Sequence, residues 1–261
     1  MQTNSYQLHQ NVLTPELERL RIQSSQFKEL EKKFLLDAGL KPYHKVLELG
    51  AGPGFVSRFI LDLIPAGELH AVEINPELHK ILENSLQGDP SAKAYLESAD
   101  NLSLNDNTID FIYGRFIFQH ISDIPSVMNE AYRCSTPGGI IATVDSDDGF
   151  IAMFPELPSV TKFLEIAQEN QKKRGGNRTV GRQLQSYMHD AGFSHIQSRL
   201  FSFSSSDMST DAFLRMFLGF KSTLVDDPEL VKMTFRELGD ALNKGGTFAN
   251  VSIVLTVGQK I

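Results

Sequence analysis

Three glycines stand at alternate positions, Gly50, Gly52 and Gly54, directly after a short apolar run and before an amphipathic segment. A strand, a glycine-rich loop and a helix in this order form the nucleotide cradle of open α/β sheets. Glycine lets the backbone approach a ligand where a Cβ atom would collide. The dinucleotide-binding fingerprint needs a third Gly or Ala three residues after the second glycine, and Phe55 stands there. The spacing therefore predicts a nucleotide-like ligand and argues against a dehydrogenase.

Two carboxylates accompany this loop. Glu48 precedes the first glycine by two residues, and Glu73 closes the next apolar segment roughly 20 residues after the loop. An acid at the end of a second strand accepts hydrogen bonds from both hydroxyls of a ribose. No Arg stands beside Glu73, which favours a ribose without a phosphate. The alternatives are a solvated strand-end carboxylate for Glu48 and a helix N-terminal carboxylate for Glu73.

The Gly-x-Gly-x-Gly pattern with its preceding acid resembles motif I of the class I S-adenosylmethionine-dependent methyltransferases, and residues 73–76 resemble the acidic second motif of that family. The resemblance implies S-adenosylmethionine as the cofactor, with Glu48 at its amino-acid end and Glu73 at its ribose. The cofactor-binding residues implied by these two motifs are Glu48, Gly50, Ala51, Gly52, Gly54, Glu73 and Ile74.

Residues 98–110 resemble the segment after the third strand in methyltransferases of the ubiquinone/menaquinone-biosynthesis type. Aligned back from Ile109 and Asp110, Ser98 takes the place of the acid that usually binds the adenine amino group. Ala99 aligns with the alanine whose backbone faces the adenine ring, and Asp100 with the acid after it. Ser98 and Asp100 therefore both remain candidates for the adenine contact, and an ordinary polar loop is the alternative.

Polar side chains also follow two later apolar segments. The resemblance places Arg115 near the methionine portion of the cofactor and His120 near the reacting atoms. A neutral imidazole accepts a proton from a phenol or a protonated amine, so His120 is a candidate base, with a turn-capping role as the alternative. Asp145 begins an acidic run that is suited to orienting an acceptor hydroxyl or amine. The run lacks the spacing of a calcium loop, and we expect no metal.

The composition excludes several classes of protein. The chain has 261 residues, 41% of them hydrophobic, and a formal net charge of −7. An acidic chain has no general electrostatic reason to bind nucleic acid or an anionic membrane. The single cysteine, Cys134, cannot form an intramolecular disulfide and fits a reducing cytoplasm. No signal peptide and no membrane-spanning run is visible, so a cytoplasmic location is expected.

Strand and helix patterns alternate through the first part of the chain. We expect strands at 45–49, 68–73, 93–97, 109–113 and 140–144, and helices at 14–38, 53–64, 75–88, 123–135 (capped by Ser122), 158–173, 180–191 and within 207–243. A final pair of strands is expected at 195–202 and 251–257. This alternation predicts an α/β, Rossmann-like doubly wound sheet of seven strands, mostly parallel with the last strand antiparallel, and helices on both faces.

The expected organisation is one domain in three parts. Residues 1–40 form an N-terminal helical cap, 41–150 a cofactor-binding core, and 151–261 a helical substrate lid together with the last two strands. The aromatic-rich segment 201–220 is the expected centre of the lid, with a simple packing helix as the alternative.

The function predicted from these features is in-line methyl transfer from S-adenosylmethionine to a small-molecule acceptor. A methyltransferase acting on nucleic acid or protein is an alternative that the basic loop 172–178 favours and that Tyr113–Phe116 disfavours, since the Asn/Asp-Pro-Pro-Tyr type of motif is missing there. A non-catalytic S-adenosylmethionine-binding protein is the other alternative. A small-molecule partner is expected, nucleic acid is not, and a homodimer remains open.

Overall fold

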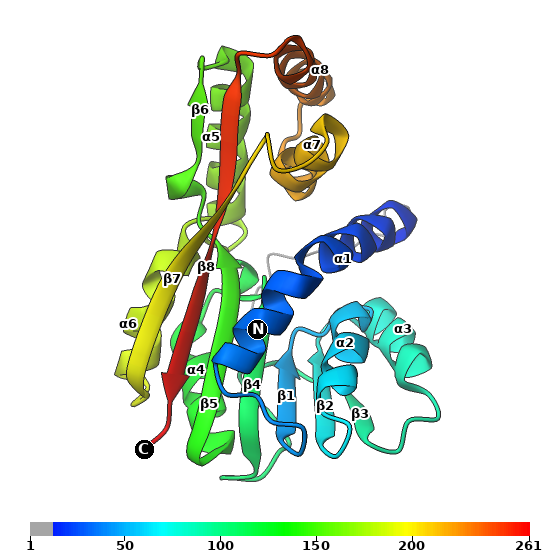
Figure 1. Cartoon of the computed structure of the whole chain (residues 1–261), viewed down its shortest axis with the longest axis vertical. Coiled ribbons are helices and arrows are strands. Elements are labelled where there is room, and N and C mark those ends of the chain that lie inside the picture. The colour runs from blue at the N-terminus through cyan, green and yellow to red at the C-terminus, as the bar shows by residue number, and fades with distance from the viewer. Residues whose placement is uncertain (1–12) are drawn as a thin grey trace.

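A twisted sheet with the strand order β3-β2-β1-β4-β5-β8-β6 organises the chain in the computed structural model, which describes residues 13–261 (Figure 1). The strands β3, β2, β1, β4 and β5 run parallel to one another. The elements of this half are α1 (Leu13–Asp37), β1 (Lys45–Leu49), α2 (Phe55–Leu63), β2 (Glu68–Glu73), α3 (Pro76–Leu86), β3 (Ala92–Leu96), β4 (Ile109–Arg115), α4 (Ile124–Cys134) and β5 (Ser135–Ser146).

The second half of the chain adds antiparallel strands and more helices. Its elements are β6 (Ala152–Phe154), α5 (Pro158–Lys173), α6 (Leu184–Asp190), β7 (Ser194–Ser204), α7 (Thr210–Leu218), α8 (Pro228–Lys244) and β8 (Phe248–Gln259). The last strand, β8, is antiparallel to β5 and pairs with β7 along most of its length, which confirms the expected final strand pair.

The expected number of strands was wrong by one. The described residues form an eight-stranded sheet, because the short strand β6 pairs with the beginning of β8. Only three residues make up β6, and both Ala152 and Phe154 are exposed, so it carries no apolar alternation. Its partner strand β8 therefore extends beyond the end of β5, and the sheet continues through the region expected to form the lid. The division of the chain at residues 40 and 150 stays a prediction.

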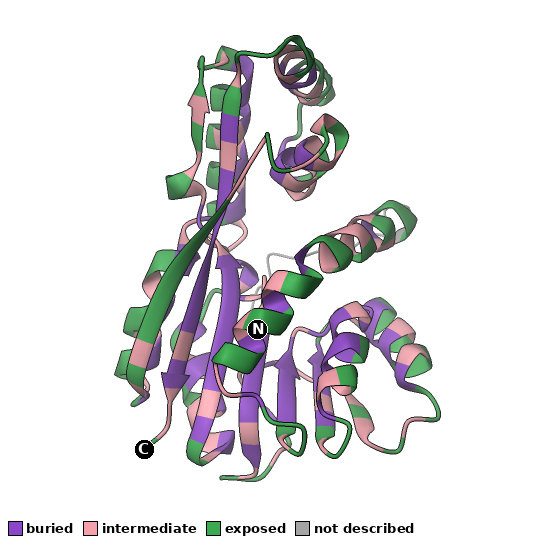
Figure 2. Ribbon diagram, viewed as in Figure 1, coloured by how far each residue is buried: buried purple, intermediate pink, exposed green. Residues whose placement is uncertain are grey.

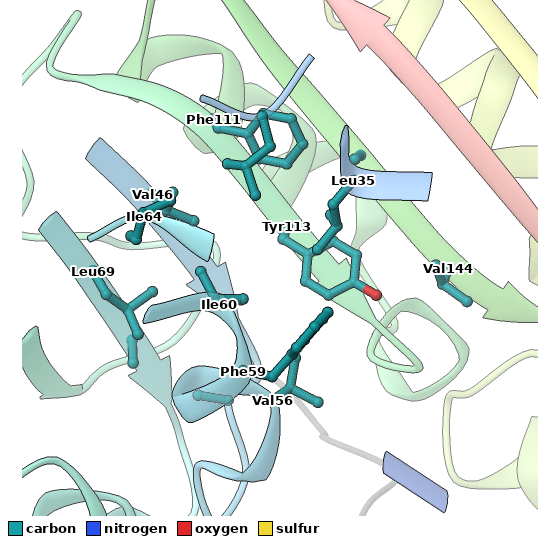
Figure 3. Packing of buried hydrophobic residues seen from close by; sticks show 14 of the residues in the cluster. Leu35, Val46, Val56, Phe59, Ile60, Ile64, Leu69, Phe111, Tyr113 and Val144 are labelled. Atoms are coloured by element: carbon teal, nitrogen blue, oxygen red, sulfur yellow. The ribbon is translucent and has the colours of Figure 1, made fainter. Parts of the chain in front are cut away.

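Two apolar layers enclose the parallel strands. One contains residues of α1 and α2 together with Val46, Phe111 and Tyr113 of the strands, and Figure 3 shows part of it. The other contains residues of α4 and α6 together with Leu47 and Ile112. Successive strand residues point to opposite faces, so strands that are buried on both faces are apolar throughout. Figure 2 shows these central strands as the most continuously buried part of the chain.

A third apolar cluster lies around the extended end of the sheet, where α5, α7 and α8 gather (Figure 1). The expected helical region 207–243 is interrupted here. Gly219 follows α7, a short 3-10 helix spans Phe220–Leu224, and the Asp227 side chain caps α8 by accepting hydrogen bonds from the first-turn N–H groups. The segment 180–183 is likewise a 3-10 turn rather than the start of an α-helix.

Two helix caps show how local chemistry fixes helix ends. The Asn75 side chain accepts a hydrogen bond from the Leu78 N–H at 3.0 Å, which confirms the expected start of α3. Ser122 does not cap α4. The cap is Asp123, whose carboxylate accepts from the Ser126 N–H at 3.2 Å. A carboxylate gains more than a hydroxyl from the positive end of a helix.

Candidate functional site

A cavity lies at the carboxyl ends of β1, β2 and β4, where open α/β sheets bind ligands. The strand order reverses between β1 and β4, which places the loops that follow these strands on either side of the cavity. Residues of α1, of α7 and of the 3-10 helix that follows α7 also contribute to its wall. The sequence-predicted residues that line it are Glu48, Gly50, Ala51, Gly52, Glu73, Ile74, Ser98, Ala99, Arg115 and His120.

The three glycines of the loop have positive φ angles of 67°, 57° and 86°. A Cβ atom at Gly50 would lie 2.7 Å from Ile117 Cδ1, and one at Gly54 would lie 2.9 Å from Leu82 Cδ1. A Cβ atom at Gly52 would meet nothing within 4 Å. Gly50 and Gly54 are therefore needed for packing as well as for conformation, whereas Gly52 leaves open space at the cavity. Gly54 itself lies outside the lining and precedes α2.

The Glu73 carboxylate is buried at the cavity wall and holds the glycine loop. It accepts hydrogen bonds from the Gly52 N–H at 2.9 Å and the Asn75 N–H at 2.8 Å. Burial raises the pKa of Glu73, while these backbone N–H groups act in the opposite direction. A carboxylate offers about four lone-pair positions. The side chain can therefore position the loop and still accept hydrogen bonds from a ligand.

The Glu48 carboxyl lies deeper, beneath the same loop. It is 3% exposed and accepts a hydrogen bond from Ser57 Oγ at 2.5 Å. Burial raises the pKa of Glu48 to about 8, and the Ser57 hydroxyl only partly offsets this. An acid with this pKa is poised to become charged when a cationic group approaches it.

The segment after β3 brings two of its three candidate residues to the cavity. Ser98 and Ala99 line it, and Asp100 does not. The Ser98 hydroxyl donates to the Asp100 carboxylate, and the Asn101 N–H donates to the Ser98 carbonyl at 3.0 Å. Asp100 therefore fixes the conformation of the segment that presents Ser98 and Ala99.

Arg115 connects β4 to α1. Its guanidinium forms a buried ion pair with Glu31 and donates to the Gln23 carbonyl at 3.2 Å. Burial raises the pKa of Glu31, and the charge of Arg115 lowers it. Arg115 also lies 4.8 Å from the centre of the Phe116 ring. Phe116 has a φ of 52°, an uncommon value for a bulky residue, and it lines the cavity at the end of β4.

His120 ends the short 3-10 helix Phe118–His120 that follows β4. Its ring is 8% exposed, and Nδ1 lies 3.3 Å from Gln171 Nε2 of α5. Burial lowers the pKa of His120 to about 3, and the nearby charges of Arg178 and Arg19 lower it further. The imidazole is therefore neutral at physiological pH.

Asp145 lies behind this turn rather than at the cavity wall. Its Oδ2 accepts hydrogen bonds from the Phe118 N–H at 2.8 Å and the Gln119 N–H at 3.3 Å. The side chain is fully buried, which raises its pKa to about 7. The geometry makes Asp145 a support for the turn that carries His120, and a direct part in the reaction stays a prediction.

The structure adds a polar cluster that the sequence analysis did not identify. Asp148, Arg178 and Lys221 all line the cavity, together with Gln119. Arg178 forms a bidentate ion pair with Asp148 at 2.9 and 3.0 Å, and its Nη1 donates to the Gln119 side chain. The sequence signals for this cluster were the acidic run that contains Asp148 and the basic loop 172–178, whose last residue turns inward and is 5% exposed.

The described residues 13–261 contain no group of three or more His, Cys, Asp and Glu side chains arranged to hold a metal. Within the same range, no helix has both the length and the apolar character needed to cross a bilayer.

Residues 47–143 match the protein family described as "Methyltransferase domain". An uncharacterized methyltransferase of Schizosaccharomyces pombe is 26% identical over 162 residues, which cover 59% of this chain and 58% of that protein. Malonyl-[acyl-carrier protein] O-methyltransferase 1 of Ilyobacter polytropus is 28% identical over 136 residues, covering 49% of this chain and 50% of that protein. The chain thus spans about half the length of these curated relatives.

The fold is shared with solved structures. Phosphoethanolamine N-methyltransferase 2 of Haemonchus contortus, solved with phosphomonomethylethanolamine and S-adenosylhomocysteine, superimposes with a TM-score of 0.61. The match covers 89% of this chain and 52% of that one at 15% sequence identity. At this identity the likeness shows the Rossmann-like fold.

Proposed function

We propose that this chain, whose residues 47–143 match the methyltransferase-domain family, is a class I S-adenosylmethionine-dependent methyltransferase that transfers a methyl group to a small-molecule acceptor. S-adenosylmethionine is the cofactor of this family. The observation that carries the proposal is one cavity that joins the glycine loop and Glu73 to an enclosed polar space at His120 and Lys221. A cofactor and a small acceptor would meet inside such a cavity.

The residues present fit the cofactor. Glu73 has lone-pair positions left for the two ribose hydroxyls, and Gly52 leaves open space for a close approach. We assign the methionine end of the cofactor to the loop 50–52 and Glu48. The protonated carboxyl of Glu48 would lose its proton and become a carboxylate beside the amino group of the cofactor. Ser98 and Ala99 would contact the adenine, and of the two candidates Ser98 is the one at the cavity wall.

Held by the loop 50–52, Glu48 and Glu73, S-adenosylmethionine would supply an electrophilic methyl group to a lone pair of the acceptor. The protein contributes position and the exclusion of water. Helix α1 covers the cofactor end through the Arg115–Glu31 pair, and the lid closes the acceptor end with Phe220 and Lys221.

His120 is proposed to orient the acceptor. With Nδ1 facing the Gln171 amide N–H, the neutral imidazole carries its proton on Nε2, which would donate a hydrogen bond to an oxygen or a nitrogen lone pair of the acceptor. With a pKa of about 3, its conjugate acid holds a proton poorly at neutral pH, which weighs against the base role predicted from the sequence. Asp145 would act indirectly by holding the backbone of the turn.

A nucleic-acid or protein acceptor is less well supported by the geometry. Arg178 of the basic loop is buried against Asp148, and Lys173 pairs with Glu169 at 2.9 Å, so the loop does not present its charges as one basic surface.

Cys134 is buried, consistent with the proposed cytoplasmic location. Assembly as a homodimer stays a prediction.

The proposal is tested with cofactor carrying a tritiated methyl group. The full chain is incubated in parallel with a small-molecule extract, total RNA and a protein extract. We expect label to enter the small-molecule fraction alone. Label in RNA or protein would favour the polymer-directed alternative, and no transfer to any fraction despite cofactor binding would favour a non-catalytic binder.

A further inference from the structure

The charged cluster at the acceptor end of the cavity indicates the class of acceptor. We infer, on the premise of the methyl transfer proposed above, that the acceptor carries an anionic oxygen group, a carboxylate or a phosphate, bound by Lys221 with support from Arg178. The inference rests on three features of the cluster: its placement, its charge balance and its hydrogen-bond donors.

The cluster is built from three separate parts of the chain. Asp148 follows β5, Arg178 follows α5, and Lys221 lies in the 3-10 helix after α7. Lys221 Nζ lies 3.4 Å from Asp148 Oδ1, and Arg178 holds both Asp148 oxygens. Arg178 and Lys221 are each 5% exposed, and all three residues line the cavity. The three charged side chains are thus shielded from bulk water and face the part of the cavity where an acceptor would bind.

The cations in this cluster outnumber the carboxylates. Asp148 is the one carboxylate that pairs with Arg178 and Lys221 in the described part of the chain. Arg19, the next cation on the cavity wall, has its own bidentate partner in Glu16 at 2.6 and 2.7 Å. His120 is neutral, so it neither adds to nor offsets the surplus. A buried charge without full compensation is costly, and an anionic ligand would remove that cost.

The pKa of Asp148 agrees with this charge balance. The two cations hold the pKa of Asp148 below its usual range although burial acts to raise it. Burial is the largest cause that lowers the pKa of Lys221 to about 8; Asp148 opposes this effect, and the charge of Arg178 adds to it.

Lys221 also has more N–H donors than the acceptors that the described residues offer it. An ammonium group carries three N–H donors. The described residues offer Lys221 two acceptors, the Phe217 carbonyl at 2.8 Å and Asp148 at 3.4 Å. Nε, Nη1 and Nη2 of Arg178 are all engaged by Asp148 and Gln119. Lys221 is thus the residue positioned to donate directly, and Arg178 contributes mainly its charge.

The experiment measures anion binding by the full chain saturated with S-adenosylhomocysteine. Inorganic phosphate and acetate are titrated separately at constant ionic strength, with calorimetry and the melting temperature as readouts. Wild type is compared with Lys221→Met and with Lys232→Met, a control at an exposed lysine. Lys221→Met leaves the Arg178–Asp148 pair in place, so we expect its stability without added anion to be unchanged or higher.

We expect at least one of the two anions to bind wild type and the control, and to bind Lys221→Met roughly tenfold more weakly or worse. The preferred anion identifies a carboxylate or a phosphate as the group bound. Two results would overturn the inference: neither anion binds wild type, or the anion binds Lys221→Met as tightly as wild type. Saturation with S-adenosylhomocysteine is verified first, so failure of the cofactor site is recognised separately.

Discussion

At the scale of single residues, the part of the cavity beside the glycine loop is distinguished by two buried acids, Glu48 and Glu73. Glu48 is the clearest case, because its one described hydrogen-bond partner is Ser57 and burial raises its pKa to about 8. The protonated acid is stable in the folded state, and the charged form requires a compensating cation. Glu73 differs because backbone N–H groups already stabilise its charge.

Glu48 makes folding stability depend on pH. Its pKa rises from 4.5 to about 8 on folding, so between these values the folded protein holds a proton that the unfolded chain has lost. The free energy of unfolding therefore falls as pH rises through this window, by at most about 1.4 kcal/mol per pH unit from this group. Glu48→Gln removes the ionisation and keeps the side-chain shape.

We expect Glu48→Gln to gain stability relative to wild type as pH rises from about 5 to about 8. Urea unfolding of both proteins at the two pH values measures the difference. Glu31, Glu73 and Asp145 also have raised pKa values, and their contributions cancel in the comparison. Equal pH dependence in the two proteins would contradict the assigned environment of Glu48.

At the scale of elements, a buried ion pair connects α1 to the sheet in addition to its apolar packing. Glu31 is 1% exposed, and its partner Arg115 reaches it from the end of β4. The same helix carries Lys33 and Asp37, an exposed pair at 2.7 Å. The two pairs offer a matched comparison within one helix.

Glu31→Ala leaves Arg115 buried without its carboxylate, and we expect a loss of about 3 kcal/mol in the free energy of unfolding. Lys33→Ala breaks only the exposed pair and is expected to change stability by less than about 1 kcal/mol. Equilibrium urea unfolding measures both variants. Similar losses in the two would show that the buried pair does not hold α1 in place.

Helices and strands could be predicted where burial gives the apolar residues a regular spacing along the chain. They could also be predicted where a residue typical of a helix N-cap precedes the helix. The bounds of β2 and α5 were predicted as observed, and Asn75 identified the start of α3. The strand β6 was not predicted, because it is held by the beginning of β8 rather than by a pattern of its own. The break in the helical region after α7 likewise depends on packing against α5 and α8.

At the scale of the whole molecule, β8 joins the parallel strands to the region where α5, α7 and α8 pack. The strand pairs with β5 through Ile253–Gln259 and with β6 through Phe248–Asn250, while β7 follows its other edge (Figure 1). These helices are therefore attached to the same sheet that carries the glycine loop. This continuity explains why Lys221 can share a cavity with residues that follow β4.

The two ends of the cavity differed in how far the sequence predicted them. Glu48, Glu73 and the glycines lie within short motifs whose spacing fixes their geometry, so their placement at one cavity could be foreseen. Asp148, Arg178 and Lys221 are far apart in the chain and meet only in the folded structure. No local sequence pattern predicts that these three residues form one cluster. The sequence likewise does not predict the acceptor that the cluster would bind.

Calorimetric titration of the full chain with S-adenosylhomocysteine tests the central claim most directly. We expect wild type to bind one equivalent, and Glu73→Ala to bind roughly tenfold more weakly or worse because the ribose loses its acceptor. Glu68→Ala, at the exposed opposite end of the same strand, is expected to bind like wild type, and circular dichroism verifies that both variants are folded. Absence of binding to wild type, or equal affinity of folded Glu73→Ala, would contradict the proposed cofactor site.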